Sequence, residues 1–322
     1  MSAEPAFEEH SNGGVVRALK DCLAGTCGGI AQVLVGQPFD TVKVRLQTQP
    51  RTGGLYTGAI DCVQKTFKAE GFGGFYKGTA TPLVGVGLCV SVQFAVFEHM
   101  KRVFRERNGG EGLSGGQFYI AGAAAGIANS ALACPIEHVR IRLQTQTATN
   151  ALYNGPIDCI KKIYSSYGIR GIFKGYGPTF IREGHGMGAY FLAYEALVNS
   201  DMSKNSITRD QIPAYRLCLY GAGAGYAMWF TSYPIDVIKS RLQTDGFAGE
   251  AKKYLSGRDC LRKTWKGEGM GGFWRGFGPT VVRAAPVNAA TFLLALIHAL
   301  PTHIPKRIIT PNPKCRLPFW PH

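Results

Sequence analysis

Three ionisable side chains, Arg182, Glu183 and Arg283, interrupt otherwise apolar stretches of this 322-residue sequence. Ionisable groups within apolar spans usually face a cavity and bind something there. An arginine can hold a carboxylate through two parallel hydrogen bonds, and an adjacent glutamate can hold an ammonium group. The three residues therefore predict a binding site for a small zwitterion. The simpler alternative is that Arg182 and Glu183 merely pair with each other.

The sequence lacks the residue sets on which most enzymes depend. No G-x-x-x-x-G-K-[ST] phosphate loop occurs, the 7 histidines are scattered, and no cysteines have zinc-ligand spacing. There is also no evident nucleophile with a base to activate it. We therefore expect a protein that is not an enzyme and that has no metal site and no cofactor.

A second set of charges belongs to a motif that occurs three times. The copies span Pro38–Gln47, Pro135–Gln144 and Pro234–Gln243, and their prolines are 97 and then 99 residues apart. This near-equal spacing indicates three tandem structural repeats. The acids are Asp40, Glu137 and Asp236, the bases one turn later are Lys43, Arg140 and Lys239, and the glutamines are Gln47, Gln144 and Gln243. Three converging helices could join these acids and bases in a ring of ion pairs that breaks and re-forms.

The elements that must position these charges are apolar helices. Four uncharged runs are close to the roughly 20 residues that a membrane span needs, namely Cys22–Phe39, Thr79–Phe97, Leu113–Ile136 and Leu217–Ile235. Core helices of a soluble protein are the alternative, but four such runs are too many. Pro38, Pro135 and Pro234 each remove a backbone donor, so we expect kinks there. Glycines four residues apart predict close helix packing, at Gly25 and Gly29, Gly122 and Gly126, and Gly221 and Gly225.

The order of segments is the same in each repeat. A membrane helix is followed by a loop, a short amphipathic surface helix, a glycine-rich turn and a second membrane helix, which gives six spans and an all-α membrane protein. The expected divisions are a disordered N-terminus (1–17), repeats at 18–112, 113–210 and 211–300, and an atypical proline-rich tail (301–322). The sixth helix is atypical as well.

Composition limits the classes of partner. Lys+Arg total 36 against 21 Asp+Glu, a net charge of +15, which suits anionic lipids or small anions. Nucleic acid is excluded because the basic residues sit beside apolar runs rather than beside interleaved aromatics. Among the 9 cysteines, Cys62, Cys159 and Cys260 occupy matching places in the repeats. We expect them to be reduced packing residues.

These motifs resemble the signature of the mitochondrial carrier family, P-x-[DE]-x-x-[KR]-x-[KR] followed later by [DE]-G-x-x-x-x-[FYW]-[KR]-G. All three first halves are present over residues 18–292, and the second half is complete in repeats 1 and 3, whereas repeat 2 has Tyr167 in place of the acid. The resemblance implies a six-helix barrel with pseudo-threefold symmetry around a water-filled cavity, with short surface helices on the matrix side. It also implies the inner mitochondrial membrane.

The resemblance assigns roles to the charged residues. It implies a matrix gate made of the pairs Asp40–Arg140, Glu137–Lys239 and Asp236–Lys43, each braced by one of the glutamines. It places Arg182-Glu183 and Arg283 at substrate contact points. Their surroundings are similar to the carnitine, ornithine and amino-acid branch, and in particular to fungal carriers implicated in glycine and glutamate transport. We therefore expect a small amino acid or related zwitterion as substrate, with carnitine, acylcarnitine or ornithine exchange as the alternative.

The family's outer gate, [FY]-[DE]-x-x-[KR], is only partly present. Glu98 and Lys101 complete it in repeat 1, Glu195 lacks its base because Val198 stands in that place, and repeat 3 departs from the pattern after Phe292. A non-transporting isoform is therefore a further alternative. The resemblance also implies a monomer with membrane lipid, cardiolipin in particular, as a partner.

Overall fold

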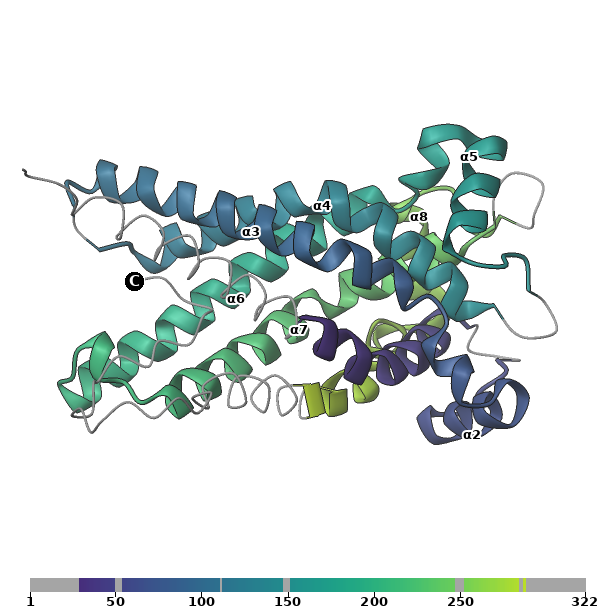
Figure 1. Cartoon of the computed structure of the whole chain (residues 1–322), viewed down its shortest axis with the longest axis horizontal. Helices are drawn as coiled ribbons and strands as arrows, with labels where there is room; N and C mark the ends of the chain where they lie inside the picture. Colours follow the sequence, from purple (N-terminus) through teal and green to yellow (C-terminus); the bar gives the residue numbers. More distant parts are fainter. Residues whose placement is uncertain are drawn as a thin grey trace, which may run out of the picture.

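Long helices running side by side make up most of the molecule (Figure 1). The computed structural model describes residues 29–49, 54–110, 112–146, 151–246, 252–283 and 286–287. The long helices are α3 (Ala80–Arg107), α4 (Gly115–Thr145), α6 (Tyr176–Asn205) and α7 (Ala214–Thr244). Residues 29–48 and 277–283 are also helical, and no described residue lies in a strand, which confirms an all-α fold. The first repeat's beginning, the sixth helix beyond residue 287 and the tail lie outside the described residues.

These helices are long enough to cross a bilayer. The shortest, α3, has 28 residues, or about 42 Å at 1.5 Å per residue, against a hydrocarbon thickness of about 30 Å. By length and composition, Phe72–Arg107 and Gly115–Thr145 are candidate membrane spans. Burial is inverted relative to a soluble protein: Val84 is 87% exposed and Phe230 62%, whereas Lys239 is 2% exposed. An apolar exterior around buried charge suits a lipid environment.

Each motif proline lies within a helix rather than at its end. Pro135 is inside α4 and Pro234 inside α7, and Pro38 lies within the helical residues 29–48. The chain therefore carries every motif onward as helix, which keeps acid and base one turn apart. The kinks expected at these prolines stay a prediction.

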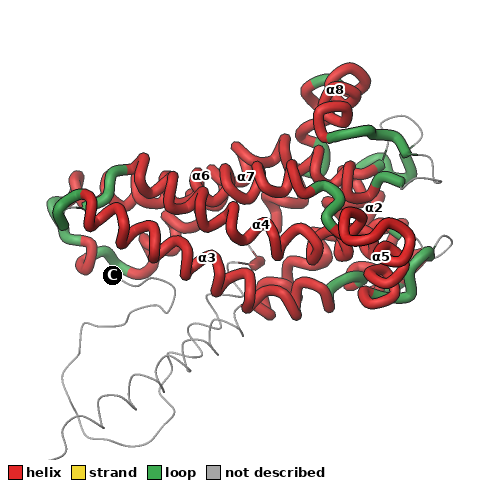
Figure 2. The backbone as a smooth tube through the Cα atoms, turned by 90° about the horizontal axis from the view of Figure 1, so that it is seen from above, coloured by secondary structure: helices red, strands yellow, loops and turns green. Residues whose placement is uncertain are grey.

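Three short helices gather at one end of the long ones (Figures 1 and 2). They are α2 (Ala59–Glu70), α5 (Pro156–Ile172) and α8 (Gly257–Glu268), and short 3-10 turns, η1 (Phe72–Tyr76) and η3 (Met270–Trp274), follow the first and third. Near the C-terminal end of each surface helix the chain changes direction at a glycine, directly after α2 and α8 and inside α5. The positive φ required there is one that glycine adopts at least cost. Gly71, Gly168 and Gly269 have φ of 65°, 61° and 64°, so three glycines re-aim the chain into the next long helix.

The surface helices begin with the same hydrogen-bonded turn. In α2, Asp61 accepts hydrogen bonds from the Thr57 amide and from Lys65 Nζ, each at 2.9 Å. The Lys65 bond and then the Thr57 bond lower the pKa of Asp61 below its ordinary value. The same acid–lysine pairs recur in the other repeats, at Asp158–Lys162 and Asp259–Lys263. An acid in the first turn also suits the positive end of the helix dipole.

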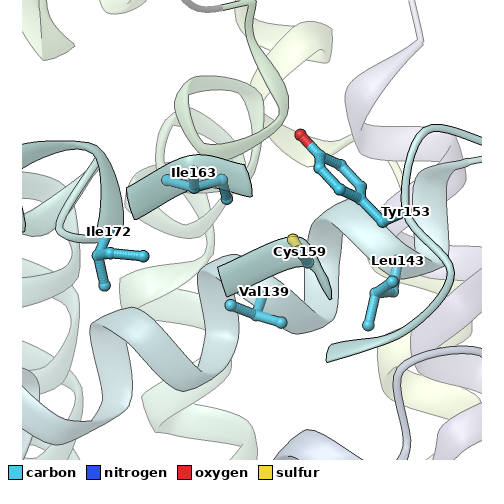
Figure 3. Packing of buried hydrophobic residues seen from close by; sticks show 6 residues of the cluster. All are labelled: Val139, Leu143, Tyr153, Cys159, Ile163 and Ile172. Atoms are coloured by element: carbon cyan, nitrogen blue, oxygen red, sulfur yellow. The ribbon is translucent and has the colours of Figure 1, made fainter. Parts of the chain in front are cut away.

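A small apolar cluster fixes each surface helix to the motif helix, and Figure 3 shows the one in repeat 2. In repeat 2 the cluster contains Val139, Leu143, Tyr153, Cys159, Ile163 and Ile172. Matching residues pack in repeat 1 (Val42, Leu46, Cys62, Phe75) and in repeat 3 (Ile238, Leu242, Cys260, Phe273). The three cysteines are fully buried, and burial raises the pKa of the Cys159 thiol to about 11. They are free thiols and packing residues, as expected.

In repeats 1 and 3 the second base of the motif, an arginine two residues after the first base, binds an acid at the end of the surface helix. Arg45 Nη2 contacts both oxygens of Glu70 at 2.9 Å, and Arg241 binds Glu268 at 2.6 and 2.9 Å. Burial raises the pKa of Glu70, but the hydrogen bonds from Arg45 and Lys77 outweigh it and hold the pKa below its ordinary value. Repeat 2 has Tyr167 here, and its Arg142 instead donates to the Asp245 carbonyl at 2.7 Å.

The glycine pair of repeat 2 lies at a close contact between two helices. A Cβ at Gly122 would lie 2.7 Å from the Met187 carbonyl oxygen, and one at Gly126 would overlap the Glu183 backbone. These two glycines therefore let α4 approach α6 closely. Gly25 lies outside the described residues, as do residues 284–285 and 288–300 of the sixth helix, so close packing at the other two glycine pairs stays a prediction.

We expect Gly126→Ala to destabilise the protein by about 1–3 kcal/mol, because the added methyl group forces α4 and α6 apart. Gly267→Ala is the matched control, because it adds the same atom to the exposed face of α8, where a Cβ would meet nothing within 4 Å and alanine's helix propensity is favourable. The thermal unfolding midpoint in detergent is the measurement. Equal midpoints for the two variants would contradict this account of α4–α6 packing.

Candidate functional site

Six motif charges form three ion pairs where the motif helices converge. Lys43 Nζ lies 2.7 Å from Asp236 Oδ2, Arg140 Nη2 lies 2.7 Å from Asp40 Oδ2, and Lys239 Nζ contacts Glu137 Oε2. Each pair joins residues from two different repeats. We call these six residues the charge ring, and the structure brings together the pairs named from the sequence.

The ring can form because each helix presents its acid and base on one face near its end. At about 4 Å and an effective dielectric of about 20, a single pair attracts by roughly 4 kcal/mol, and desolvation cancels much of this. The side chains of Lys43 and Asp236 are only 8% and 6% exposed. Separating such a pair without giving each ion a new partner would therefore be costly.

The three residues assigned to substrate binding are part of the same network. Arg182 on α6 lies 3.0 Å from Glu137 Oε1, contacts Glu183 directly, and lies 3.7 Å from Asp236 Oδ1. The Arg182–Glu183 pair named as the simpler alternative therefore exists, but the arginine also reaches two acids of the ring.

The second arginine reaches the third acid. Arg283 Nε lies 3.1 Å from Asp40 Oδ1. A Cβ at Gly36 would lie 2.7 Å from this nitrogen, so the glycine leaves the space in which the guanidinium sits. With this contact, each ring acid meets two cations.

The described network has one positive charge in excess. Its four carboxylates are Asp40, Glu137, Asp236 and Glu183, and its five cations are Lys43, Arg140, Lys239, Arg182 and Arg283. Since the arginines hold bidentate anions well, the cluster is suited to admit one further carboxylate.

The three motif glutamines are not equivalent. Gln47 Nε2 donates to Asp236 Oδ2 at 3.2 Å, which is contact with a ring pair. Gln144 instead donates to Thr41 Oγ1 at 3.3 Å, and within the described structure Gln243 does not bond to Glu137 or Lys239. A brace on all three pairs stays a prediction.

Gln37 occupies a bracing position that the sequence did not reveal. Its Oε1 accepts a hydrogen bond from Arg140 Nη2 at 2.6 Å, and its Nε2 donates to the Lys77 carbonyl at 3.1 Å. The motif begins one residue later, and the matching residues are Cys134 and Tyr233, so comparison of the repeats hides this role.

The second base of each motif (Arg45, Arg142 and Arg241) also donates to a backbone carbonyl of a neighbouring repeat. The sequence did not reveal this role either. Arg45 Nε donates to the Gln144 carbonyl at 2.9 Å, and Arg241 Nε donates to the Gln47 carbonyl at 3.1 Å. An arginine occurs at this place in all three motifs, and that recurrence is the sequence feature that could have indicated the role.

One ring cation also rests against aromatic faces. Lys43 Nζ lies 4.3 Å from the centre of the Trp229 ring and 5.3 Å from that of Tyr233. Both aromatic residues come from α7, as does Asp236. A cation held by a carboxylate and two ring faces gains from each of them.

The charges expected at the opposite end are paired locally. Lys101 Nζ bonds to Glu98 Oε1 at 2.9 Å within α3. Glu195 accepts from Arg209 Nη2 and Nη1 at 3.0 and 3.1 Å, and Arg209 belongs to η2 (Arg209–Gln211), the link to α7. Neither pair crosses to another repeat, and the third repeat's outer segment lies outside the described residues.

The described part of the chain contains no group of three or more His, Cys, Asp or Glu side chains placed to hold a metal ion. The ion pairs and the excess cation described above make the site suited to recognition of a charged ligand.

Comparison with known proteins agrees with this geometry. A family model described as mitochondrial carrier protein matches residues 15–108, 113–204 and 210–296. The glutamate/glycine mitochondrial carrier of Schizosaccharomyces pombe is 54% identical over 290 residues, which is 90% of this chain and 95% of that protein. The mitochondrial glycine transporter of Saccharomyces cerevisiae is 52% identical, covering 89% and 92%. The bovine mitochondrial basic amino acids transporter is 41% identical, covering 84% and 88%. The chain belongs to the mitochondrial carrier family.

Proposed function

We propose that this protein carries a small amino acid, or a related zwitterion, across the inner mitochondrial membrane by alternating access. Members of its family are transporters, and it is a multi-pass protein of that membrane. The position of Arg182 supports this substrate class. The arginine lies beside Glu183 and also contacts the ring acids Glu137 and Asp236. The relatives that carry glycine, glutamate or basic amino acids support the same class.

The finer architecture that we propose is six helices in three repeats around a central cavity. The three family matches support it, as do the ion pairs that join each repeat to the next. The end that bears α2, α5 and α8 would face the matrix. The charge ring would then be the matrix gate, closed here, while the outer charges pair locally.

The shared partners suggest how substrate opens the ring. A substrate carboxylate that binds Arg182 and Arg283 would draw both arginines away from the ring acids. Each ring acid would then keep only one cation, while the substrate ammonium would offset the loss at Glu183. A ligand can shift such an equilibrium only by its stronger contacts with the opened state. The exchange of partners supplies that difference.

Closure at the outer end would require another exchange. Lys101 would leave Glu98 and meet Glu195, which in turn would leave Arg209. With Val198 in the place of a base, we propose an outer gate weaker than the ring.

Two alternatives remain beside amino-acid transport. Carnitine, acylcarnitine or ornithine exchange would use the same arginines, and Trp229 near the ring (4.3 Å from Lys43 Nζ) offers an aromatic face that suits a quaternary ammonium. A non-transporting isoform is the other alternative, because of the departure after Phe292. Uptake by the full chain distinguishes all three.

Lipid contact at the surface helices is also proposed, for a protein that acts as a monomer. Ile60 and Phe67 of α2 are 76% and 58% exposed, and Trp265 of α8 is 55% exposed, as expected for helices in the interface. Basic residues on the same helices would attract cardiolipin. Quenching of Trp265 fluorescence by brominated lipid is the test, and an unquenched signal would place α8 in water.

We expect Arg182→Ala to reduce uptake of labelled glycine into liposomes at least about tenfold, because substrate loses a charged hydrogen-bonding partner. Arg182→Lys should recover only part, since lysine lacks the planar fork of arginine. Arg170→Ala is the control, because Arg170 is exposed on α5. Unchanged uptake by Arg182→Ala would remove this residue from the site. No uptake of any amino acid or of carnitine by the wild type would overturn the transport proposal.

Reversal of one ring pair tests the gate. Asp40→Arg and Arg140→Asp should each reduce uptake at least about tenfold, because each leaves like charges in contact in a buried setting. The double variant should recover part of the uptake. Recovery stays partial because Arg283 still faces position 40. Asp40→Arg combined with Lys239→Asp, which are not partners, should recover nothing. Equal recovery by the two double variants would contradict the assigned pairing.

A further inference from the structure

Asn129 is a buried polar side chain on α4 that faces the substrate-site carboxylate. Its Nδ2 donates to Glu183 Oε2 at 3.2 Å, and the residue is 4% exposed. Its other polar atom, Oδ1, is buried and has no hydrogen-bond partner in the described structure. Because it lies eight positions before the acid of its motif, outside the motif itself, the motif does not reveal this residue.

The two oxygens of Glu183 have different partners. Arg182 binds Oε1, whereas Asn129 binds Oε2. The amide therefore fixes the orientation of the carboxylate on one side and leaves Oε1 as the oxygen that can exchange partners. When a substrate carboxylate takes Arg182, Oε1 becomes available to an ammonium group.

An unpaired buried amide oxygen is unfavourable unless a donor reaches it. The next residue along α4 differs in this respect: Ser130 Oγ donates to the Ile127 carbonyl at 2.6 Å. A primary ammonium group carries three N–H donors. One can bind Glu183 Oε1, and a second is available for Asn129 Oδ1.

We infer that Asn129 is a second contact for the substrate ammonium, beside Glu183, and that it orients this carboxylate for the exchange. The inference rests on the proposed transport function and narrows its substrate class. A primary ammonium can donate to Oδ1, whereas a trimethylated one has no N–H to donate. The pair Glu183–Asn129 therefore favours unmodified amino acids over carnitine-like zwitterions.

The test uses three ligands that share a carboxylate: glycine, its trimethylated form betaine, and acetate, which has no ammonium. The KM of labelled glycine and the inhibition constants of betaine and acetate are measured in liposomes for wild type, Asn129→Ala and Asn129→Ser. Ser130→Ala is the matched control, because it removes a buried polar group from the same helix without touching Glu183. If the wild type takes up another amino acid instead of glycine, that amino acid and its trimethylated form are used.

We expect Asn129→Ala to raise the KM of glycine about tenfold, the loss of a hydrogen bond to a charged group. The inhibition constants of betaine and acetate should stay as in wild type, so the preference for glycine falls by the same factor. Ser130→Ala should behave as wild type. The ligand-induced rise of the unfolding midpoint in detergent gives the same comparison without transport, for a variant that inserts poorly into liposomes.

Two results would overturn the inference. An unchanged KM of glycine in both Asn129 variants would show that the amide does not contact the ammonium. An equal weakening of all three ligands would show that Asn129 acts only through the packing of α4 on α6. Failure of the wild type to take up any amino acid is a different outcome, because it rejects the proposed transport and this inference with it.

Discussion

Burial of charge where the motif helices converge is the constraint on which the rest of the structure depends. Nine ionised side chains meet there among the described residues: each ring acid contacts two cations, and Arg182 contacts three of the four carboxylates. Such a cluster is stable only while every ion keeps a partner. Sharing makes the cluster adaptable, because each ring acid retains one cation when an arginine leaves it. The helices around it are held in place by contacts that do not involve these charges.

Much of this arrangement could be predicted from the sequence, because its main elements recur three times. The repeated motif gave the ring pairs and the order of the helices, and the matching cysteines indicated the packed face of each surface helix. What could not be predicted depends on three-dimensional contacts of residues outside the motif. Gln37 has no amide counterpart in the other repeats, and Asn129 has one only in repeat 1, so comparison of the three repeats did not select them. Arg182 was selected for its charge, but its contact with ring acids depends on how α6 packs beside α4 and α7.

The repeats are similar in sequence but unequal in detail, and the inequalities cluster near the site. Gln37 accepts a hydrogen bond from Arg140 of one ring pair, whereas repeats 2 and 3 have Cys134 and Tyr233 at the matching position. Arg182 reaches two ring acids and Arg283 reaches the third. A substrate without threefold symmetry needs such a site, because a symmetrical one would offer it three equal orientations. The features that recur in all three repeats thus hold the helices together, and the residues that differ between repeats recognise the substrate.

Gly36 illustrates how an uncharged position can control charge. Its missing side chain leaves the space that the flexible guanidinium of Arg283 occupies beside Asp40. A methyl group at this position would meet the end of a mobile side chain rather than the backbone, so the helices could remain packed while the arginine moved aside. Natural variants at such a position would pass a screen for expression and stability and still alter transport. A substitution that impairs transport therefore need not replace a residue that binds substrate or carries charge.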